Sequence, residues 1–155
     1  MTRVNRIALL FIVTFISVPA MAGPAIQHWQ TANGANVYFV PAPELPMVDV
    51  RVVFDAGSAR EGDKWGLASL TNGLFAEGAG GKTAQELSEA FEDVGAQLDY
   101  GSLIDMAWVG VRTLTEQSKL DASLNALTTL LTKADFPQTA FEREQRRMLI
   151  GLEQK

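Results

Sequence analysis

The stretch from Trp65 to Leu87 constrains the fold most, because it predicts two helices joined by a short glycine-rich loop. The first helix is expected over residues 66–76, although Gly73 inside it costs about 1 kcal/mol relative to alanine. The loop Glu77–Lys82 follows. Thr83-Ala84-Gln85-Glu86 is a capping box, which predicts that the second helix begins there and continues to about Val94.

The residues on either side of this stretch predict strands. Asn33-Gly34 lies between two short β-prone runs, which is a strong hairpin signal. From Met47 to Phe54, valines alternate with charged residues, so a strand with one buried face is expected. Residues 98–114 are also strand-like, and Gly101 among them indicates a bulge or a close backbone approach.

Two further helices are expected toward the end of the chain. Leucines with helical spacing follow Ser118, and Asp135-Phe136-Pro137 ends that helix. A last helix is expected over about Gln138–Glu153. Two strand-rich stretches and four helices together predict an α+β fold.

The first 22 residues have the features of an export signal. Arg3 and Arg6 precede an apolar run from Ile7 to Val18, and Ala20-Met21-Ala22 supplies the small residues that a signal peptidase requires. We expect cleavage after Ala22, leaving residues 23–155 as one domain. The apolar run is short for a membrane span, so the mature chain is expected to be periplasmic or secreted without a stable membrane anchor.

Composition limits the chemistry that remains. Without Arg3 and Arg6 the chain has 11 basic and 18 acidic residues, which argues against nucleic acid as a partner. There is no cysteine, so neither a disulfide nor a thiolate site can form. Stability must therefore come from packing.

The first helix resembles the metal helix of the insulinase/pitrilysin zinc peptidases, the inverzincins, which carry His-x-x-Glu-His. Gly66-Leu67-Ala68 matches the lead-in to that motif and Leu74-Phe75 matches its exit. The three functional positions then fall on Ser69, Asn72 and Gly73. Serine is a poor zinc ligand, glycine has no side chain, and asparagine cannot act as a base, so no hydrolytic zinc is expected in this chain.

The resemblance extends to the last helix, whose entry Phe141-Glu142-Arg143-Glu144 is similar to the helix that supplies the family's third zinc ligand, a glutamate. This alignment places that ligand at Ile150 or Gly151, and Glu153 misses the position. The resemblance implies that all three ligands and the general base are absent from the chain.

The resemblance implies that residues 23–155 form the N-terminal part of an insulinase-like peptidase domain, with an antiparallel-rich sheet packed against helices. The domain is expected to be incomplete at its C-terminus because family domains are longer. In several family members an active subunit pairs with a homologue that has lost its metal site. The implied function is an exported non-catalytic subunit that helps to enclose a peptide beside an active, zinc-bearing partner. The implied peptide-binding residues lie on a sheet edge, where a peptide adds as a strand: Leu98, Asp99, Gly101 and Ser102.

Other interpretations remain open. The chain could be a stand-alone peptide-binding or scaffold domain, or an inactive fragment of a longer subunit. Gly80-Gly81-Lys82-Thr83 resembles part of a phosphate-binding loop, but Ala76 stands where the first glycine is required. The lone His28 is more often a surface residue than a metal ligand. The acidic residues of the last helix could form an acid/base cluster, but a solvated face is favoured: Glu142, Glu144 and Glu153.

Overall fold

The structure is a computed structural model that describes residues 23–153. The expected export signal, residues 1–22 with its cleavage site after Ala22, lies outside the described residues. The described residues fall into two units, with the division between Leu45 and Pro46.

The first unit contains a β-hairpin. Strands β1 (Gln27–Gln30) and β2 (Asn36–Phe39) pair antiparallel. Gly34 in the connecting turn has a φ of 89°, a conformation that glycine adopts without strain. The Gly34 N–H donates to the Thr31 carbonyl at 2.9 Å. The hairpin predicted around Asn33-Gly34 is therefore confirmed.

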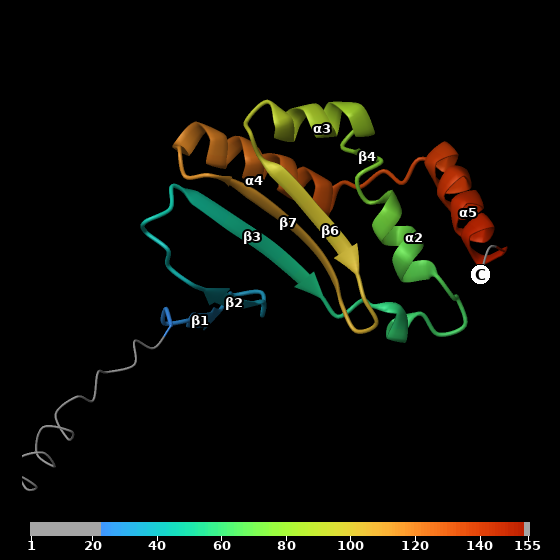
Figure 1. The fold of residues 1–155 in the computed structure, drawn as a ribbon, viewed down its shortest axis with the longest axis horizontal. Coiled ribbons are helices and arrows are strands. Elements are labelled where there is room, and N and C mark those ends of the chain that lie inside the picture. Colours follow the sequence, from blue (N-terminus) through green and yellow to red (C-terminus); the bar gives the residue numbers. More distant parts are fainter. Residues whose placement is uncertain (1–22, 154–155) are drawn as a thin grey trace, which may run out of the picture. The chain divides into compact units, whose positions relative to one another are not determined.

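The second unit is built on a three-stranded antiparallel sheet with the strand order β3-β7-β6 (Figure 1). The strands are β3 (Met47–Phe54), β6 (Gln97–Ser102) and β7 (Ala107–Leu114). Along β3, Val48 and Val50 are half-buried whereas Asp49 and Arg51 are exposed. The expected strand with one buried face is confirmed.

A tight turn divides the strand-like stretch 98–114 into β6 and β7. The Leu103 N–H donates to the Met106 carbonyl at 2.7 Å. A short 3-10 helix, η1 (Ser58–Arg60), supports this turn, because the Ser58 N–H donates to the Leu103 carbonyl at 3.0 Å. Leu103 and Ile104 are apolar, which is why no turn was expected here.

The helices follow the expected order. Helix α2 is shorter than predicted because the chain turns after Leu74, and the glycine loop forms a two-residue antiparallel pair. The elements are α2 (Leu67–Leu74), β4 (Gly78–Ala79), β5 (Lys82–Thr83), α3 (Ala84–Glu92), α4 (Gln117–Thr132) and α5 (Gln138–Glu153). In the described part of the chain, no helix is both long enough and apolar enough to cross a membrane.

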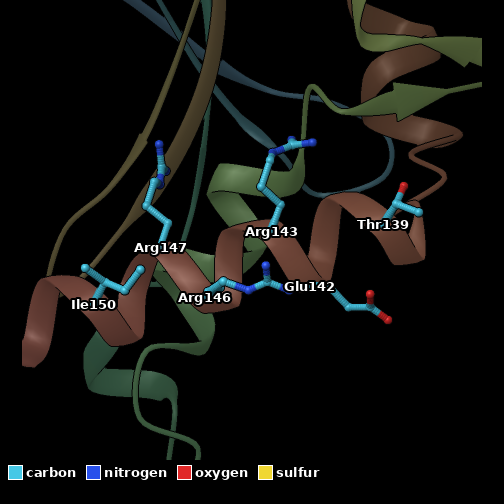
Figure 2. A pocket seen from close by; sticks show the side chains of 6 residues that line it. All are labelled: Thr139, Glu142, Arg143, Arg146, Arg147 and Ile150. Carbon is cyan, nitrogen blue, oxygen red and sulfur yellow. The ribbon is translucent and has the colours of Figure 1, made fainter.

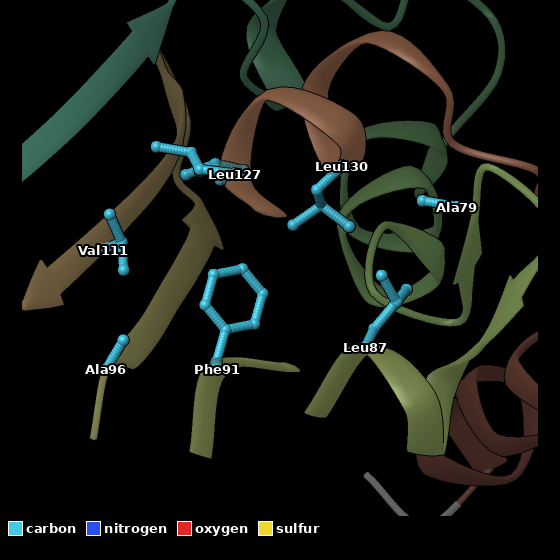
Figure 3. Packing of buried hydrophobic residues seen from close by; sticks show 8 residues of the cluster. Ala79, Leu87, Phe91, Ala96, Val111, Leu127 and Leu130 are labelled. Atoms are coloured by element: carbon cyan, nitrogen blue, oxygen red, sulfur yellow. The ribbon is translucent and has the colours of Figure 1, made fainter. Parts of the chain in front are cut away.

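The hydrophobic core lies between one face of the sheet and helices α3 and α4. Leu87 and Phe91 of α3 point toward Leu127 and Leu130 of α4 and toward Val111 of β7 (Figure 3). A buried polar contact adds to this packing, since the hydroxyls of Thr113 and Ser123 lie 2.8 Å apart and link β7 to α4. The α+β prediction, with an antiparallel sheet packed against helices, is confirmed.

Candidate functional site

The three motif positions lie on α2, which contacts both β6 and α5. Ser69 is exposed, and Asn72 and Gly73 are half-buried. The structure therefore brings the predicted motif positions next to the predicted peptide-binding strand. Segments that are about 30 residues apart in sequence meet at this place.

The first turn of α2 is held by a carboxylate that the sequence analysis did not identify. Gly66 precedes the helix with a φ of 89° and has no side chain to cap it. Instead, the Glu61 carboxylate accepts the Gly66 N–H at 2.9 Å and the Ala68 N–H at 2.6 Å. A negative group at a helix N-terminus satisfies free amides and interacts favourably with the helix dipole. Glu61 therefore fixes where α2 begins.

Helix α5 meets α2 through Glu144 and Met148. A Cβ atom built on Gly73 would lie 3.6 Å from Oε2 of Glu144. One built on Gly66 would lie 3.0 Å from Cε of Met148. An added Cβ at Gly66, just before α2, would therefore crowd Met148, whereas one at Gly73 would make an ordinary contact with Glu144. The Glu144 carboxylate thus lies beside the last predicted motif position.

Glu144 is buried, with 6% of its surface exposed, so the predicted solvated face is wrong for this residue. Ala140, Glu144 and Met148 recur every four residues and therefore lie on one side of α5, toward α2. Glu142 and Glu153 are exposed, as a solvated face requires. Glu144 lies four residues from both Ala140 and Met148. This spacing is the sequence signal that could have identified Glu144 as buried.

Two arginines compensate the charge of Glu144. Nη2 of Arg147 lies 2.5 Å from Oε2 of Glu144, and Nε of Arg143 lies 3.6 Å from Oε1. Arg143 also pairs with Glu77 at 2.6 Å, a hydrogen bond that raises the pKa of the Arg143 guanidinium. Figure 2 shows Arg143 and Arg147 projecting from the same side of α5. Both residues line a hollow of about 430 Å³.

The side chains at the predicted position of the third zinc ligand do not fit a hydrolytic zinc. Ile150 is 48% exposed, and a Cβ on Gly151 would meet nothing within 4 Å. Neither residue offers a metal-binding side chain, and the Glu144 carboxylate is already paired with two guanidiniums, those of Arg143 and Arg147. Among residues 23–153, no group of three or more histidine, cysteine, aspartate or glutamate side chains is arranged to hold a metal ion.

The predicted peptide-binding residues all lie on β6: Leu98, Asp99, Gly101 and Ser102. Within the described residues, β6 pairs only with β7 and is an edge of the sheet. An edge strand has backbone N–H and C=O groups that an added strand can pair with. The location suits peptide addition, and the assignment of these four residues stays a prediction.

The glycine loop is arranged as a hairpin turn rather than as a phosphate cradle. Gly80 and Gly81 have φ values of 60° and 78°, as the two central residues of a tight β-turn require. The Gly81 N–H donates to the Asp135 carboxylate at 2.9 Å. An acidic side chain at this amide disfavours a phosphate there.

His28 lies in β1 and stacks on Tyr38, with ring centroids 4.6 Å apart. Both side chains are exposed on the hairpin. This arrangement agrees with the surface interpretation of the lone histidine.

Comparison with known proteins gives a family match. Residues 37–154 match the family described as Insulinase (Peptidase family M16). No curated protein matches the chain.

Two solved structures share the fold. A peptidase M16 inactive domain from Pseudomonas fluorescens is 39% identical, with a TM-score of 0.81, over 83% of this chain and 31% of that chain. A protease from Helicobacter pylori is 22% identical, with a TM-score of 0.68, over 79% of this chain and 29% of that one. The chain thus spans less than a third of the length of either protein.

Proposed function

The chain belongs to the insulinase family of peptidases, M16, and we propose that it is an exported, non-catalytic member that helps an active subunit to enclose peptide substrates. The observation that carries the proposal is the α2–α5 contact. The frame of a metal helix is retained, whereas Ser69, Asn72 and Gly73 occupy the motif positions. Zinc is expected only in the partner.

The charge at this contact supports the loss of a metal. A zinc ion would attract carboxylates and repel cations, whereas the buried Glu144 is neutralised by Arg147 at 2.5 Å and Arg143 at 3.6 Å. The relative from Pseudomonas fluorescens is described as an inactive domain, which favours the same role for this chain.

The proposed contribution to proteolysis is a binding surface. The edge strand β6 lies beside α2, so a peptide that pairs with β6 would run past the helix that bears the metal motif in active relatives. Backbone pairing needs no special side chain and can persist after the metal ligands are lost.

The experiment is to purify the chain with its bound companions from its native envelope and to assay the mixture for chelator-sensitive cleavage of an unstructured peptide. The proposal predicts a companion with an intact His-x-x-Glu-His helix and activity that is lost on chelation. Recovery of the chain alone, without activity, would contradict the pairing.

A second candidate is a peptide-binding or scaffold domain that acts without a peptidase partner, and β6, an edge strand among residues 23–153, fits it equally. The two differ in whether an intact family member co-purifies. Peptide binding by a chain recovered alone would favour the scaffold.

A further inference from the structure

The sheet face opposite the core contains two glycines that allow a neighbouring side chain to cross a strand. Gly110 of β7 pairs with Arg51 of β3 on one side and with Asp99 of β6 on the other. Nη2 of Arg51 lies 2.8 Å from Oδ2 of Asp99. Because Gly110 has no side chain, Arg51 reaches over β7 to β6.

The second crossing brings an indole to the edge of the sheet. Gly101 of β6 is the register partner of Trp108 of β7. A Cβ on Gly101 would collide with Cζ2 and Cη2 of Trp108, so the six-membered ring lies over Gly101. Trp108 therefore extends across β6, away from its own strand.

The indole is held in this orientation by polar partners. Its Nε1–H donates to Oδ2 of Asp99 at 2.8 Å, and the Arg51 guanidinium carbon lies 5.7 Å from the ring centroid. A cation at that distance from a tryptophan ring is attracted to its π face. We call this group of Arg51, Asp99, Gly101 and Trp108 the indole shelf.

The indole shelf adjoins the place where a peptide would pair with β6. Successive residues of an added strand alternate between the two faces of the sheet, so every second side chain would lie on the shelf side. The peptide residue that pairs beside Gly101 would lie in the same cross-strand row as Gly101 and Trp108. Its side chain would meet ring carbons, since the indole nitrogen already donates to Asp99.

We infer that the indole shelf selects peptides with a large apolar side chain, preferably aromatic, at the residue that pairs beside Gly101. The Asp99 carboxylate accepts from both Arg51 and Trp108, so a cationic side chain gains little there. A flat apolar ring offers contact area and favourable aromatic geometry to another ring. The inference rests on peptide addition at β6, which belongs to the proposed function.

The test uses fluorescently labelled, extended threonine/lysine peptides, each with a single phenylalanine at a different position, and measures Kd by anisotropy on the full chain. Phenylalanine at alternate positions is expected to tighten binding about fivefold relative to the phenylalanine-free peptide. In Trp108→Ala the ratio of the two Kd values should fall to about one.

Two further variants test whether a lost preference in Trp108→Ala could come from misfolding. Trp108→Phe keeps a ring over Gly101 and should retain part of the preference. Trp65→Ala removes a tryptophan that is 90% exposed and outside the shelf, and should retain all of it.

The outcomes separate the two proposals. Peptide binding without a phenylalanine preference, or a preference unchanged in Trp108→Ala, would overturn the indole shelf and leave peptide addition standing. Failure of the unmodified chain to bind any peptide of the series would contradict both.

Discussion

Glu144 is a buried carboxylate at the place where α2 and α5 meet. Its carboxylate lies beside Gly73 at the α2–α5 contact, and Arg143 and Arg147 neutralise it. A buried carboxylate without partners would be costly, so the two arginines are part of the fold and not only of the surface. These ion pairs lie within α5, and they neutralise the carboxylate that α5 buries against α2.

Replacing this carboxylate should weaken the contact. Glu144→Gln keeps the shape but removes the charge that Arg147 pairs with, and we expect a loss of roughly 1–2 kcal/mol in the free energy of unfolding. Chemical denaturation measures the loss. The matched control is Glu142→Gln, an exposed neighbour on α5, which should change stability by less than about 0.5 kcal/mol. Equal effects of the two substitutions would contradict the role given to Glu144.

Asp49 gives a pH-dependent prediction. It accepts two hydrogen bonds from Arg112, at 2.7 and 2.9 Å, and these lower the pKa of the Asp49 carboxyl. A carboxyl whose pKa is lower in the folded state adds stability above its unfolded pKa of about 4. That stability is lost as the pH falls through the folded value.

Asp49→Asn should therefore cost about 0.5 kcal/mol near neutral pH, the size typical of an exposed ion pair. The difference from the unmodified chain should shrink as the pH falls below about 4. Urea unfolding across this range measures it, with the exposed Asp63→Asn as control. A difference that grows toward acid pH would contradict the assignment.

Among the elements, α3 is the one that local sequence determines most directly. Thr83 and Glu86 form both hydrogen bonds of the predicted capping box, which confirms it. The Thr83 N–H and the Thr83 hydroxyl both donate to the Glu86 carboxylate, and these two hydrogen bonds lower the pKa of that carboxyl. Local patterns of this kind predicted the hairpin, the β3 face and the four helices, because each depends on residues close in sequence.

Features that depend on distant residues could not be predicted in this way. Glu61 caps α2 across a loop, and Glu144 is buried only because α5 packs on α2. The division between β6 and β7 depends on a turn of apolar residues that η1 supports. For the candidate site, the sequence placed the motif positions on a helix, but not the carboxylate and arginines beside them.

Removing the threonine cap should destabilise α3. Thr83→Ala deletes the hydroxyl that accepts the Glu86 N–H, and we expect a loss of about 1 kcal/mol in the free energy of unfolding. Thr128→Ala, on the exposed side of α4, is the control and should cost little. If the two substitutions had the same effect, the cap would not be what stabilises the start of α3.

At the scale of the whole molecule, stability depends on the packing of α3 and α4 on the sheet. Phe91 is 3% exposed and contacts the centre of this core. Phe91→Ala should cost about 3–5 kcal/mol, because a large cavity remains. Thermal or denaturant unfolding measures the change, and the exposed Leu149→Ala should leave stability nearly unchanged. If Phe91→Ala lowered the free energy of unfolding by less than about 1 kcal/mol, Phe91 would not be part of the stabilising core.

The central functional proposal is that the chain has the frame of a zinc peptidase without a site for the metal. The most direct test is to load the purified full chain with zinc, remove unbound ions, and measure bound zinc and cleavage of an unstructured peptide with and without a chelator. A chain without a metal site should hold no stoichiometric zinc and show no chelator-sensitive cleavage. One zinc per chain, together with cleavage that the chelator abolishes, would contradict it.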